Sequence, residues 1–546
     1  MRPGPGPSRL LLPAVRRHAG AAMKRHFNTA GPCRPDWHYM IPAERRLPEA
    51  PGLVEQYGYF VVHAPRQTGK TTALRALAKQ LTAAGRHAAL LVSCEAGQAA
   101  GDDYGAAERI LLSNLTQEAA GQLPADLQPP PFPDVAAGAL LGAALATWAR
   151  ACPRPLVLFL DEIDALRGQS LIAVLRQLRA GFPNRPERFP ASVVLCGLRD
   201  VRDYKAASGG DPSRLGTASP FNIKLESLRL GDFSEAEVHE LYAQHTEDTG
   251  QIFTEEALAR AFELTGGQPW LVNALGREIV DKMALPPSEA ITAEHLNQAR
   301  ERLIQARATH LDSLVARLHE PRVKRFIEPL MAGTEIRVDP TFNDDLRYGR
   351  DLGLLAADDP IRVANPIYRE VIARVLADDS QGQIVLEPSS FLLADGRLAF
   401  RKLLRGFARF WAEQGEALAG NLPYHEVAPQ LVLMAYLQRV VNGGGAVDRE
   451  YGIGRGRIDM LLRWPYRKAG GSKGVQRRAM ELKVWRDGEP DPVKKGLEQI
   501  DAYLAQLRLR RGVLVVFDRR SKKKRRAPVF EELRTRSGRE VRVLRA

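Results

Sequence analysis

The sequence predicts an α/β protein in which a parallel sheet carries a phosphate-binding loop and a second, basic α/β unit follows. Three observations lead to this fold class. The stretch from Ala64 to Thr72 lies between an apolar run and a helical pattern. Another apolar run, Leu156 to Leu160, ends in the acidic residues 161–164. The excess positive charge lies entirely in the last part of the chain.

Length and composition set the outer limits of this prediction. At 546 residues the chain is too long for one hydrophobic core, and its apolar fraction of 45% is typical of globular proteins. The longest apolar run, Val135 to Ala146, is shorter than the roughly 20 residues of a membrane span, so we expect a packed helix and no membrane partner. The cysteines form no Cys-x-x-Cys pair, which predicts free thiols in a reducing cytoplasm. They are Cys33, Cys94, Cys152 and Cys196.

The first 22 residues contain arginines and prolines but no acidic residue. This composition is typical of a transit peptide, or of a start codon placed too early. We therefore expect residues 1–22 to be a disordered or mis-started end, with Met23 as the true start.

A phosphate-binding loop is predicted between the apolar strand Tyr59 to Val62 and a helical pattern with leucines on one face. In such a loop, backbone N–H groups and the positive end of the helix surround the phosphates. Lys70 would neutralise the β and γ oxygens of ATP, and the Thr71 hydroxyl would hold Mg²⁺. The nucleotide-binding residues are Ala64, Pro65, Arg66, Gln67, Thr68, Gly69, Lys70, Thr71 and Thr72.

Ala64 departs from the loop pattern, which has glycine at this position. Alanine can turn where φ stays negative, so the departure weakens the prediction without removing it. The alternative is a chance Gly-Lys-Thr at an ordinary strand-to-helix turn. Ala64 also leaves the rate of ATP hydrolysis open.

After a second strand, residues 88–94, the strand Leu156 to Leu160 is continuously apolar, as expected for burial on both faces of a parallel sheet. It ends in Asp161 and Glu162, at the edge where open α/β sheets bind ligands. Asp161 can hold the Mg²⁺ shell, and Glu162 can orient or deprotonate the attacking water. The alternative is a helix N-terminus that simply favours acidic residues.

Two further residues are candidate nucleotide sensors. Arg199 follows the fourth strand, Ala191 to Gly197, and either senses the γ-phosphate, acts as a finger on a neighbour in a homo-oligomer, or is an ordinary surface arginine. Pro269 lies in a Gly-Gly-x-Pro break between helices, which is either a plain turn or a nucleotide contact. A fifth strand is expected from Asn222 to Leu225.

The chain divides at changes of pattern. We expect the ATPase core at 23–232, a helical lid at 233–310 that opens with a capping box, and a winged-helix-like unit at 311–377. The last of these has three helical patterns and a small hairpin; because it is not basic, we interpret it as a spacer or protein contact. A polar linker at 378–395 precedes the final unit, 396–546.

The final unit is strongly basic. From residue 401 onward there are 33 Lys and Arg against 16 Asp and Glu, a balance of +17, whereas the remainder has 45 against 48, or −3. Such an imbalance is expected for a nucleic-acid partner, above all DNA. A solubilising surface is the alternative, and the run Lys522 to Arg526 is either backbone-binding or a solvated loop.

This unit carries a second set of acidic residues on two predicted strands. Asp459 begins one strand, while Glu481 and Lys483 alternate on the next and so point to the same face. If the strands pair, Asp459 joins them. Two carboxylates and a lysine there can bind Mg²⁺, activate its water and stabilise charge on a phosphodiester. Glu426, opening an amphipathic helix, is a third candidate ligand.

Gln499 and Tyr503 are four residues apart, on one face of the helix after the second strand, and are candidate DNA contacts. A third buried strand is expected at Arg511 to Phe517. Separately, each of these acidic and basic residues is more common as a solvated or structural group. Their ordered combination in a basic unit favours a nuclease site.

These motifs carry a family resemblance. The first 380 residues resemble bacterial P-loop ATPases of the AAA+/STAND kind, and the last 150 resemble the PD-(D/E)xK nuclease superfamily. The matching ATPase motifs lie at 64–72, 160–164, 197–203 and 266–269, and the nuclease motifs at 456–459, 481–483 and 499–503. Ile458 stands where the nuclease motif is named for proline.

The resemblance implies a P-loop NTPase parallel sheet with a helical lid and a winged-helix-like domain, followed by a restriction-endonuclease-like α/β domain. It also implies ATP hydrolysis through Glu162, metal binding by Asp459 and Glu481, and attack polarised by Lys483. The expected function is an ATP-controlled DNA endonuclease, for defence against foreign DNA. The alternatives are a nucleotide-dependent switch or DNA-binding ATPase whose tail binds without cutting, and a scaffold that binds ATP without hydrolysing it.

Overall fold

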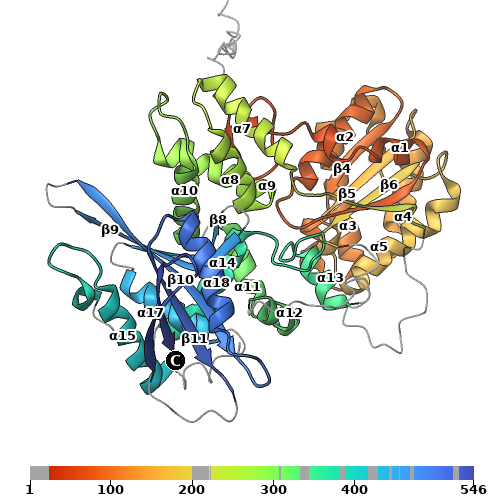
Figure 1. The fold of residues 1–546 in the computed structure, drawn as a ribbon. Helices are drawn as coiled ribbons and strands as arrows, with labels where there is room; N and C mark the ends of the chain where they lie inside the picture. Colours follow the sequence, from red (N-terminus) through yellow and green to blue (C-terminus); the bar gives the residue numbers. More distant parts are fainter. Residues whose placement is uncertain are drawn as a thin grey trace, which may run out of the picture.

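The computed structural model describes residues 24–199, 221, 223–306, 309–331, 343–381, 388–415, 428–441, 445–453, 456–467, 472–520 and 528–546. Figure 1 shows a parallel sheet in red to yellow and a second sheet in blue, with green helices between them. The predicted N-terminal end, residues 1–22, lies outside the described residues.

The first sheet has five parallel strands in the order β4-β5-β6-β3-β7. The strands are β3 (Tyr59–His63), β4 (Ala88–Ser93), β5 (Leu156–Asp161), β6 (Ser192–Gly197) and β7 (Glu226–Arg229). The four strands β3 to β6 confirm the predicted apolar runs. The expected fifth strand, residues 222–225, was placed wrongly, because β7 begins only at Glu226. Its start is set by pairing with β3, since Glu226 is the partner of Phe60.

Helices cover both faces of this sheet because its strands alternate their side chains between two cores. Tyr59 and Val61 of β3 join the core under α3 to α5, whereas Phe60 and Val62 join the core under α1 and α2. The helices are α1 (Ala50–Glu55), α2 (Lys70–Ala83), α3 (Tyr104–Gln122), α4 (Leu140–Ala151) and α5 (Gly168–Gly181). The helix expected at 135–146 forms five residues later, as α4, where Trp148 is fully buried.

A short N-terminal segment with two strands packs on the helices predicted to form the lid. Its parallel strands are β1 (His26–Phe27) and β2 (His38–Tyr39). Phe27 packs edge-on against Tyr242, and Arg25 forms an ion pair with Asp248. The lid helices are α7 (Glu235–Thr249), α8 (Glu255–Thr265), α9 (Pro269–Arg277) and α10 (Ala293–Gln305). The predicted capping box is confirmed, with Ser234 and Glu237 exchanging hydrogen bonds.

The segment after the lid contains the predicted three helices and a hairpin contact. The helices are α11 (Thr309–Arg317), α12 (Pro321–Met331) and α13 (Asp344–Asp351), followed by an antiparallel bridge between Leu355 and Val363. A further helix, α14 (Pro366–Gln381), was not predicted. It includes residues 378–381, so the first part of the expected linker is helical instead.

The C-terminal part is built on a mixed six-stranded sheet in the order β12-β13-β11-β10-β9-β8. Its strands are β8 (Ala446–Ile453), β9 (Gly456–Arg467), β10 (Lys473–Trp485), β11 (Arg511–Asp518), β12 (Val529–Arg534) and β13 (Glu540–Arg545). Its helices include α15 (Phe400–Phe410), α17 (Ala428–Val441) and α18 (Val493–Gln506). The apolar runs predicted β9, β10 and β11 as strands. The structure adds their pairing, which is antiparallel between β9 and β10 and parallel between β10 and β11.

The helix α17 differs from the expected amphipathic helix. Its residues from Leu431 to Leu437 are all buried, because α14 and β8 both pack against it. One hydrophobic core runs from Phe27 through the lid and α14 to Leu544 of the second sheet. Continuous apolar packing therefore joins the helices after residue 234 to the second sheet, whereas the parallel sheet has cores of its own.

The four cysteines all lie in the described part of the chain and are free thiols, as expected. No helix within the described ranges combines the length and apolarity needed to cross a membrane.

Gly267 offers a test of how the turn before α9 packs against Phe233, which lies just before α7. A Cβ added there would lie 1.9 Å from the backbone oxygen of Phe233, and φ is +77°. Gly250 has a similar φ of +75° but open space around its Cβ. We expect Gly250→Ala to cost about 1 kcal/mol of unfolding free energy, and Gly267→Ala to cost at least twice as much, since backbone must also move. Thermal and denaturant unfolding of both variants would measure this; equal losses would contradict it.

Candidate functional site

The phosphate loop joins β3 to α2 in the way its residue types allow. The Ala64 N–H donates to Gly197 O of the neighbouring strand end at 3.3 Å. Positive φ values occur at Gln67 (60°) and Gly69 (94°), not at Ala64. The first position of the loop therefore needs no glycine here, which explains how alanine is accepted.

Lys70 lies inside the loop. Its ammonium Nζ donates to the carbonyls of Ala64 and Pro65, both at 2.8 Å. Burial lowers the pKa of Lys70, and the nearby Asp161 carboxylate acts in the opposite direction. The lysine is thus held at the strand end, where its charge can meet a phosphate bound on the N–H groups of the loop.

Thr71 and Asp161 meet at the edge of the sheet. The Thr71 hydroxyl donates to Asp161 Oδ2 at 2.6 Å, and the Glu162 N–H donates to Asp161 Oδ1 at 2.9 Å. Asp161 ends β5 and is buried. A hydroxyl and a carboxylate side by side are the oxygen ligands that suit Mg²⁺ beside phosphates, so these residues fit that cation.

Glu162 has a strained backbone, with φ 55° and ψ 40°. The Ser93 hydroxyl of β4 donates to its Oε2 at 2.9 Å. Partial burial raises the pKa of Glu162, against the effect of that hydrogen bond. A left-handed non-glycine residue with a raised pKa beside a phosphate loop is typical of a carboxylate that handles a proton.

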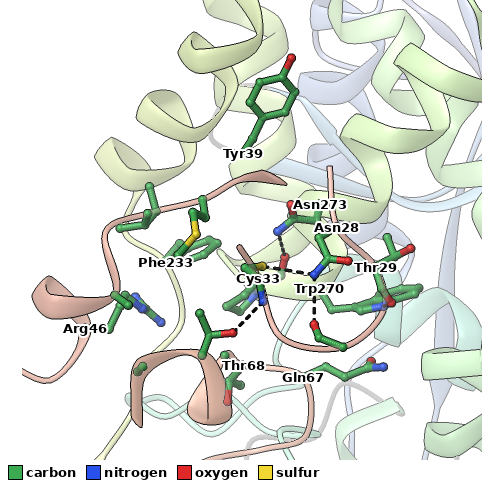
Figure 2. Close-up of a pocket in the computed structure, with 18 of the residues that line it drawn as sticks. Asn28, Thr29, Cys33, Tyr39, Arg46, Gln67, Thr68, Phe233, Trp270 and Asn273 are labelled. Carbon is green, nitrogen blue, oxygen red and sulfur yellow. Dashed lines mark hydrogen bonds between the residues drawn. The ribbon is translucent and has the colours of Figure 1, made fainter. Parts of the chain in front are cut away.

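A pocket lies beside the loop, between the N-terminal segment and the lid (Figure 2). Its walls come from residues 28–33, residues 39–46, the loop with the start of α2, and the lid. The residues are Asn28, Thr29, Ala30, Gly31, Cys33, Tyr39, Met40, Ile41, Ala43, Arg46, Gln67, Thr68, Gly69, Thr72, Ala73, Phe233, Pro269, Trp270 and Asn273. Pro269 thus lies in the wall, at the first position of α9.

The N-terminal wall was missed by sequence reasoning. The Cys33 N–H donates to Thr72 Oγ1 at 3.0 Å, and Trp270 Nε1 donates to Thr29 O at 2.9 Å. Residues 28–33 are therefore tied both to α2 and to the lid. The available signal was the Asn28 turn, whose side chain accepts from Ala30 N and donates to Gly31 O.

Arg199 lies apart from this pocket. It is 8% exposed, and its Nε lies 3.1 Å from Asp351 Oδ2 of α13. Its guanidinium also lies 4.8 Å from the ring centroid of Tyr348. The interpretation as a surface arginine is therefore wrong, because the α13 segment covers this strand end. The sensor and finger roles stay predictions.

The second set of acidic residues converges on the C-terminal sheet. Met460 and Met480 are paired across β9 and β10. Just beyond this pair, Leu482 N donates to Asp459 Oδ2 at 2.7 Å. Lys483 Nζ donates to Glu481 Oε1 at 2.7 Å. The prediction that Glu481 and Lys483 share a face is confirmed.

Glu481 is a buried carboxylate whose charged form is disfavoured. It is 2% exposed, and its Oε2 has no hydrogen-bond partner. Burial and then the charge of Asp459 raise the pKa of Glu481 to about 7, while Lys483 opposes them. A buried carboxylate oxygen with no partner fits a site that takes a cation or a donor from outside the chain.

Of the remaining candidate residues of this unit, some lie in the described part of the chain and others lie outside it. Gln499 and Tyr503 lie on α18, which packs on β10, and Gln499 Oε1 is buried without a partner. Glu426 and the run 522–526 lie outside the described residues. Within the described ranges, no group of three or more His, Cys, Asp or Glu side chains is arranged to hold a metal.

The parallel sheet, the loop with its lysine, and the acidic end of β5 define the first part of the chain as a P-loop NTPase. Residues 54–204 match the family model described as an AAA domain. This segment is therefore an ATPase domain of the AAA P-loop type. The matched residues end before the C-terminal sheet, so the match does not bear on that sheet.

Solved structures with remote similarity were also found. The Walker-type ATPase PABY2304 of Pyrococcus abyssi is 13% identical over 63% of this chain and 99% of its own, with a TM-score of 0.45. The RuvB Holliday junction branch migration motor of Thermotoga maritima is 14% identical over 60% and 93%, with a TM-score of 0.33. Cdc6p from Pyrobaculum aerophilum is 14% identical over 62% and 94%, with a TM-score of 0.35. No curated protein matches the chain.

Lys70→Ala tests the phosphate loop directly. Loss of the ammonium removes charge-assisted hydrogen bonds to phosphate, so we expect ATP affinity to fall roughly 100-fold or more. Lys79→Ala, an exposed lysine on the same helix, is the matched control and should leave affinity unchanged. Titration with a fluorescent ATP analogue measures both, and equal affinities would contradict the site.

Proposed function

We propose that the protein is an ATP-hydrolysing switch that controls a Mg²⁺-dependent DNA endonuclease site in its C-terminal part. The observation that carries the nuclease half is the convergence of Asp459, Glu481 and Lys483, with one buried Glu481 oxygen left without a partner. The AAA domain supplies the ATPase half.

In the ATPase half, the loop N–H groups and Lys70 bind and orient the phosphates. Thr71 and Asp161 would hold Mg²⁺, which neutralises phosphate charge when bound. Glu162 accepts a proton from the attacking water, a task that its raised pKa favours, and the hydrogen bond from Ser93 holds its carboxylate in place. The pocket bounded by Trp270 and residues 28–33 accepts the base and sugar.

In the nuclease half, Asp459 and Glu481 would hold a divalent cation, which supplies an activated water and stabilises charge on the phosphodiester when bound. The Lys483 ammonium lies next to Glu481 and can orient the attacking group or bind the phosphate. Gln499 and Tyr503, one helical turn apart on α18, are the proposed contacts to the nucleic acid.

Three contacts support control by the nucleotide. Arg199 at the end of β6 pairs with Asp351, and the Gly353 backbone lies so close to Pro65 that a Cβ there would be 2.9 Å from the proline ring. Arg229 Nη2 donates to Arg350 O at 3.1 Å. A movement of the loop must therefore disturb the α13 segment. That segment is continuous with α14, which packs on α17 beside the second sheet.

DNA is the proposed partner because the excess charge of +17 lies in residues 401–546, against −3 for the rest of the chain. We propose a cytoplasmic protein, as the free thiols favour, acting against foreign DNA. Assembly into a homo-oligomer, with Arg199 at a neighbour, is part of the same proposal only if the Arg199–Asp351 pair opens.

One observation favours a second candidate, a nucleotide-dependent switch whose tail binds DNA without cutting it. In the described part of the chain, Asp459 and Glu481 lack a third metal-binding side chain, and Lys483 already forms an ion pair with Glu481. Such a site can hold a phosphate without activating water.

Glu162→Gln tests hydrolysis. The amide keeps the shape but cannot accept the proton, so we expect ATP turnover to fall roughly 100-fold or more while ATP binding persists. Glu118→Gln on α3, an exposed carboxylate away from the loop, should change neither. A colorimetric phosphate-release assay decides, and full turnover by Glu162→Gln would contradict the assigned role.

Glu481→Ala tests cutting. We expect loss of Mg²⁺-dependent nicking of plasmid DNA to background, with ATP turnover retained, because the second carboxylate ligand is gone. Glu540→Ala on β13, which removes an exposed partner of Arg511, is the control and should nick normally. If the wild-type protein binds DNA but never nicks it with Mg²⁺ or Mn²⁺, the non-cutting switch is the function.

A further inference from the structure

One side chain in the pocket beside the phosphate loop is left with an unused acceptor. Asn273 on α9 is 6% exposed, and its Oδ1 has no hydrogen-bond partner. A buried polar atom without a partner carries a free-energy cost that a ligand can remove. Asn273 lines the pocket together with Pro269 and Trp270.

The orientation of this amide is determined by its own helix. Asn273 Nδ2 donates to Pro269 O at 2.9 Å. A carbonyl can only accept, so the nitrogen must face Pro269 and the oxygen must be the free atom. The unpartnered atom of this pocket residue is therefore purely an acceptor, and a ligand that engages it must present an N–H or O–H.

The neighbouring polar groups of the pocket are engaged. Asn28 bonds Gly31 O and Cys33 Sγ, and Thr72 Oγ1 accepts from Cys33 N. Arg46 donates to Gly231 O. In the described pocket, Asn273 Oδ1 thus stands out as a side-chain acceptor that the protein itself does not use.

Figure 2 shows where Asn273 lies relative to the phosphate loop. Gln67 and Thr68 of the loop line one side of the pocket, and Asn273 lies on the opposite side, beyond Asn28. Phosphates bound on the loop place the base of the nucleotide away from Gln67 and Thr68. The base is the part of the ligand that can reach Asn273.

We propose that Asn273 Oδ1 accepts a hydrogen bond from the exocyclic 6-amino group of adenine and thereby selects 6-aminopurine nucleotides. A 6-oxo purine would set a carbonyl oxygen against the amide oxygen, and the site would reject it. This inference rests on the proposed ATP-binding function and adds to it a residue that reads the base.

The test is a cycle of two proteins and two ligands. The affinities of wild type and Asn273→Ala are measured for ATP and for purine riboside triphosphate, which has hydrogen in place of the 6-amino group. We expect wild type to bind ATP roughly 10-fold more tightly than the analogue. In Asn273→Ala that ratio should fall to about one, because ATP loses its partner and the analogue loses nothing.

Two further variants keep the result interpretable. Asn273→Leu preserves volume without an acceptor and should also lose the preference for ATP, even if Asn273→Ala folds poorly. Asn297→Ala removes another buried asparagine, which lies on α10, accepts from Arg260 of α8 and donates to Glu294. This variant should keep the preference for ATP over the analogue.

The outcomes distinguish a failure of the proposed ATP binding from a failure of the proposed role of Asn273. If wild type binds neither nucleotide, the proposed ATP function fails. If wild type binds ATP but does not prefer it over the analogue, or if Asn273→Ala weakens both ligands equally, Asn273 has only a structural role and the inference is overturned. Inosine triphosphate, with a 6-oxo group, should bind wild type more weakly than either ligand.

Discussion

The hydrogen bond from the Thr71 hydroxyl to Asp161 is the contact on which the ATPase half depends. It joins two residues 90 positions apart, at 2.6 Å, across the carboxyl edge of the sheet. The contact exists because β5 lies one strand away from β3, with β6 between them, and every strand runs the same way. Because the strands are parallel, the phosphate loop after β3 and the carboxylate of Asp161 at the end of β5 lie at the same edge of the sheet. Both faces of the sheet are buried, so its polar groups gather at that edge.

The pocket beside the phosphate loop is shared among distant parts of the chain. Residues 28–33 reach it from the N-terminal segment, and Trp270 and Asn273 reach it from the lid. Because Thr29 O accepts from Trp270 and Cys33 N donates to Thr72, the N-terminal segment bridges loop and lid. A ligand bound in this pocket would contact both the loop and the helices predicted to form the lid, which is the arrangement that the proposed switch needs.

The second sheet also brings polar side chains together through strand pairing, but here the paired strands are antiparallel. Antiparallel pairing of β9 and β10 brings Asp459 beside Glu481, and alternation along β10 adds Lys483. The cost is visible in Glu481, whose buried and partly uncompensated carboxylate has a raised pKa. A buried carboxylate with a raised pKa is compatible with the proposed cation site.

The sequence by itself determined the elements whose signal is local. Continuous apolar runs located β3 to β6, the capping box located α7, and the alternation of Glu481 and Lys483 predicted their shared face. It misplaced β7 and α4 and missed α14, because edge pairing and packing against distant helices decide where weakly patterned segments begin. Only the tertiary structure decided that Arg199 is paired with Asp351 and that Asn273 keeps a free acceptor. Those facts depend on which side chains meet across the fold, and no local period in the chain records such meetings.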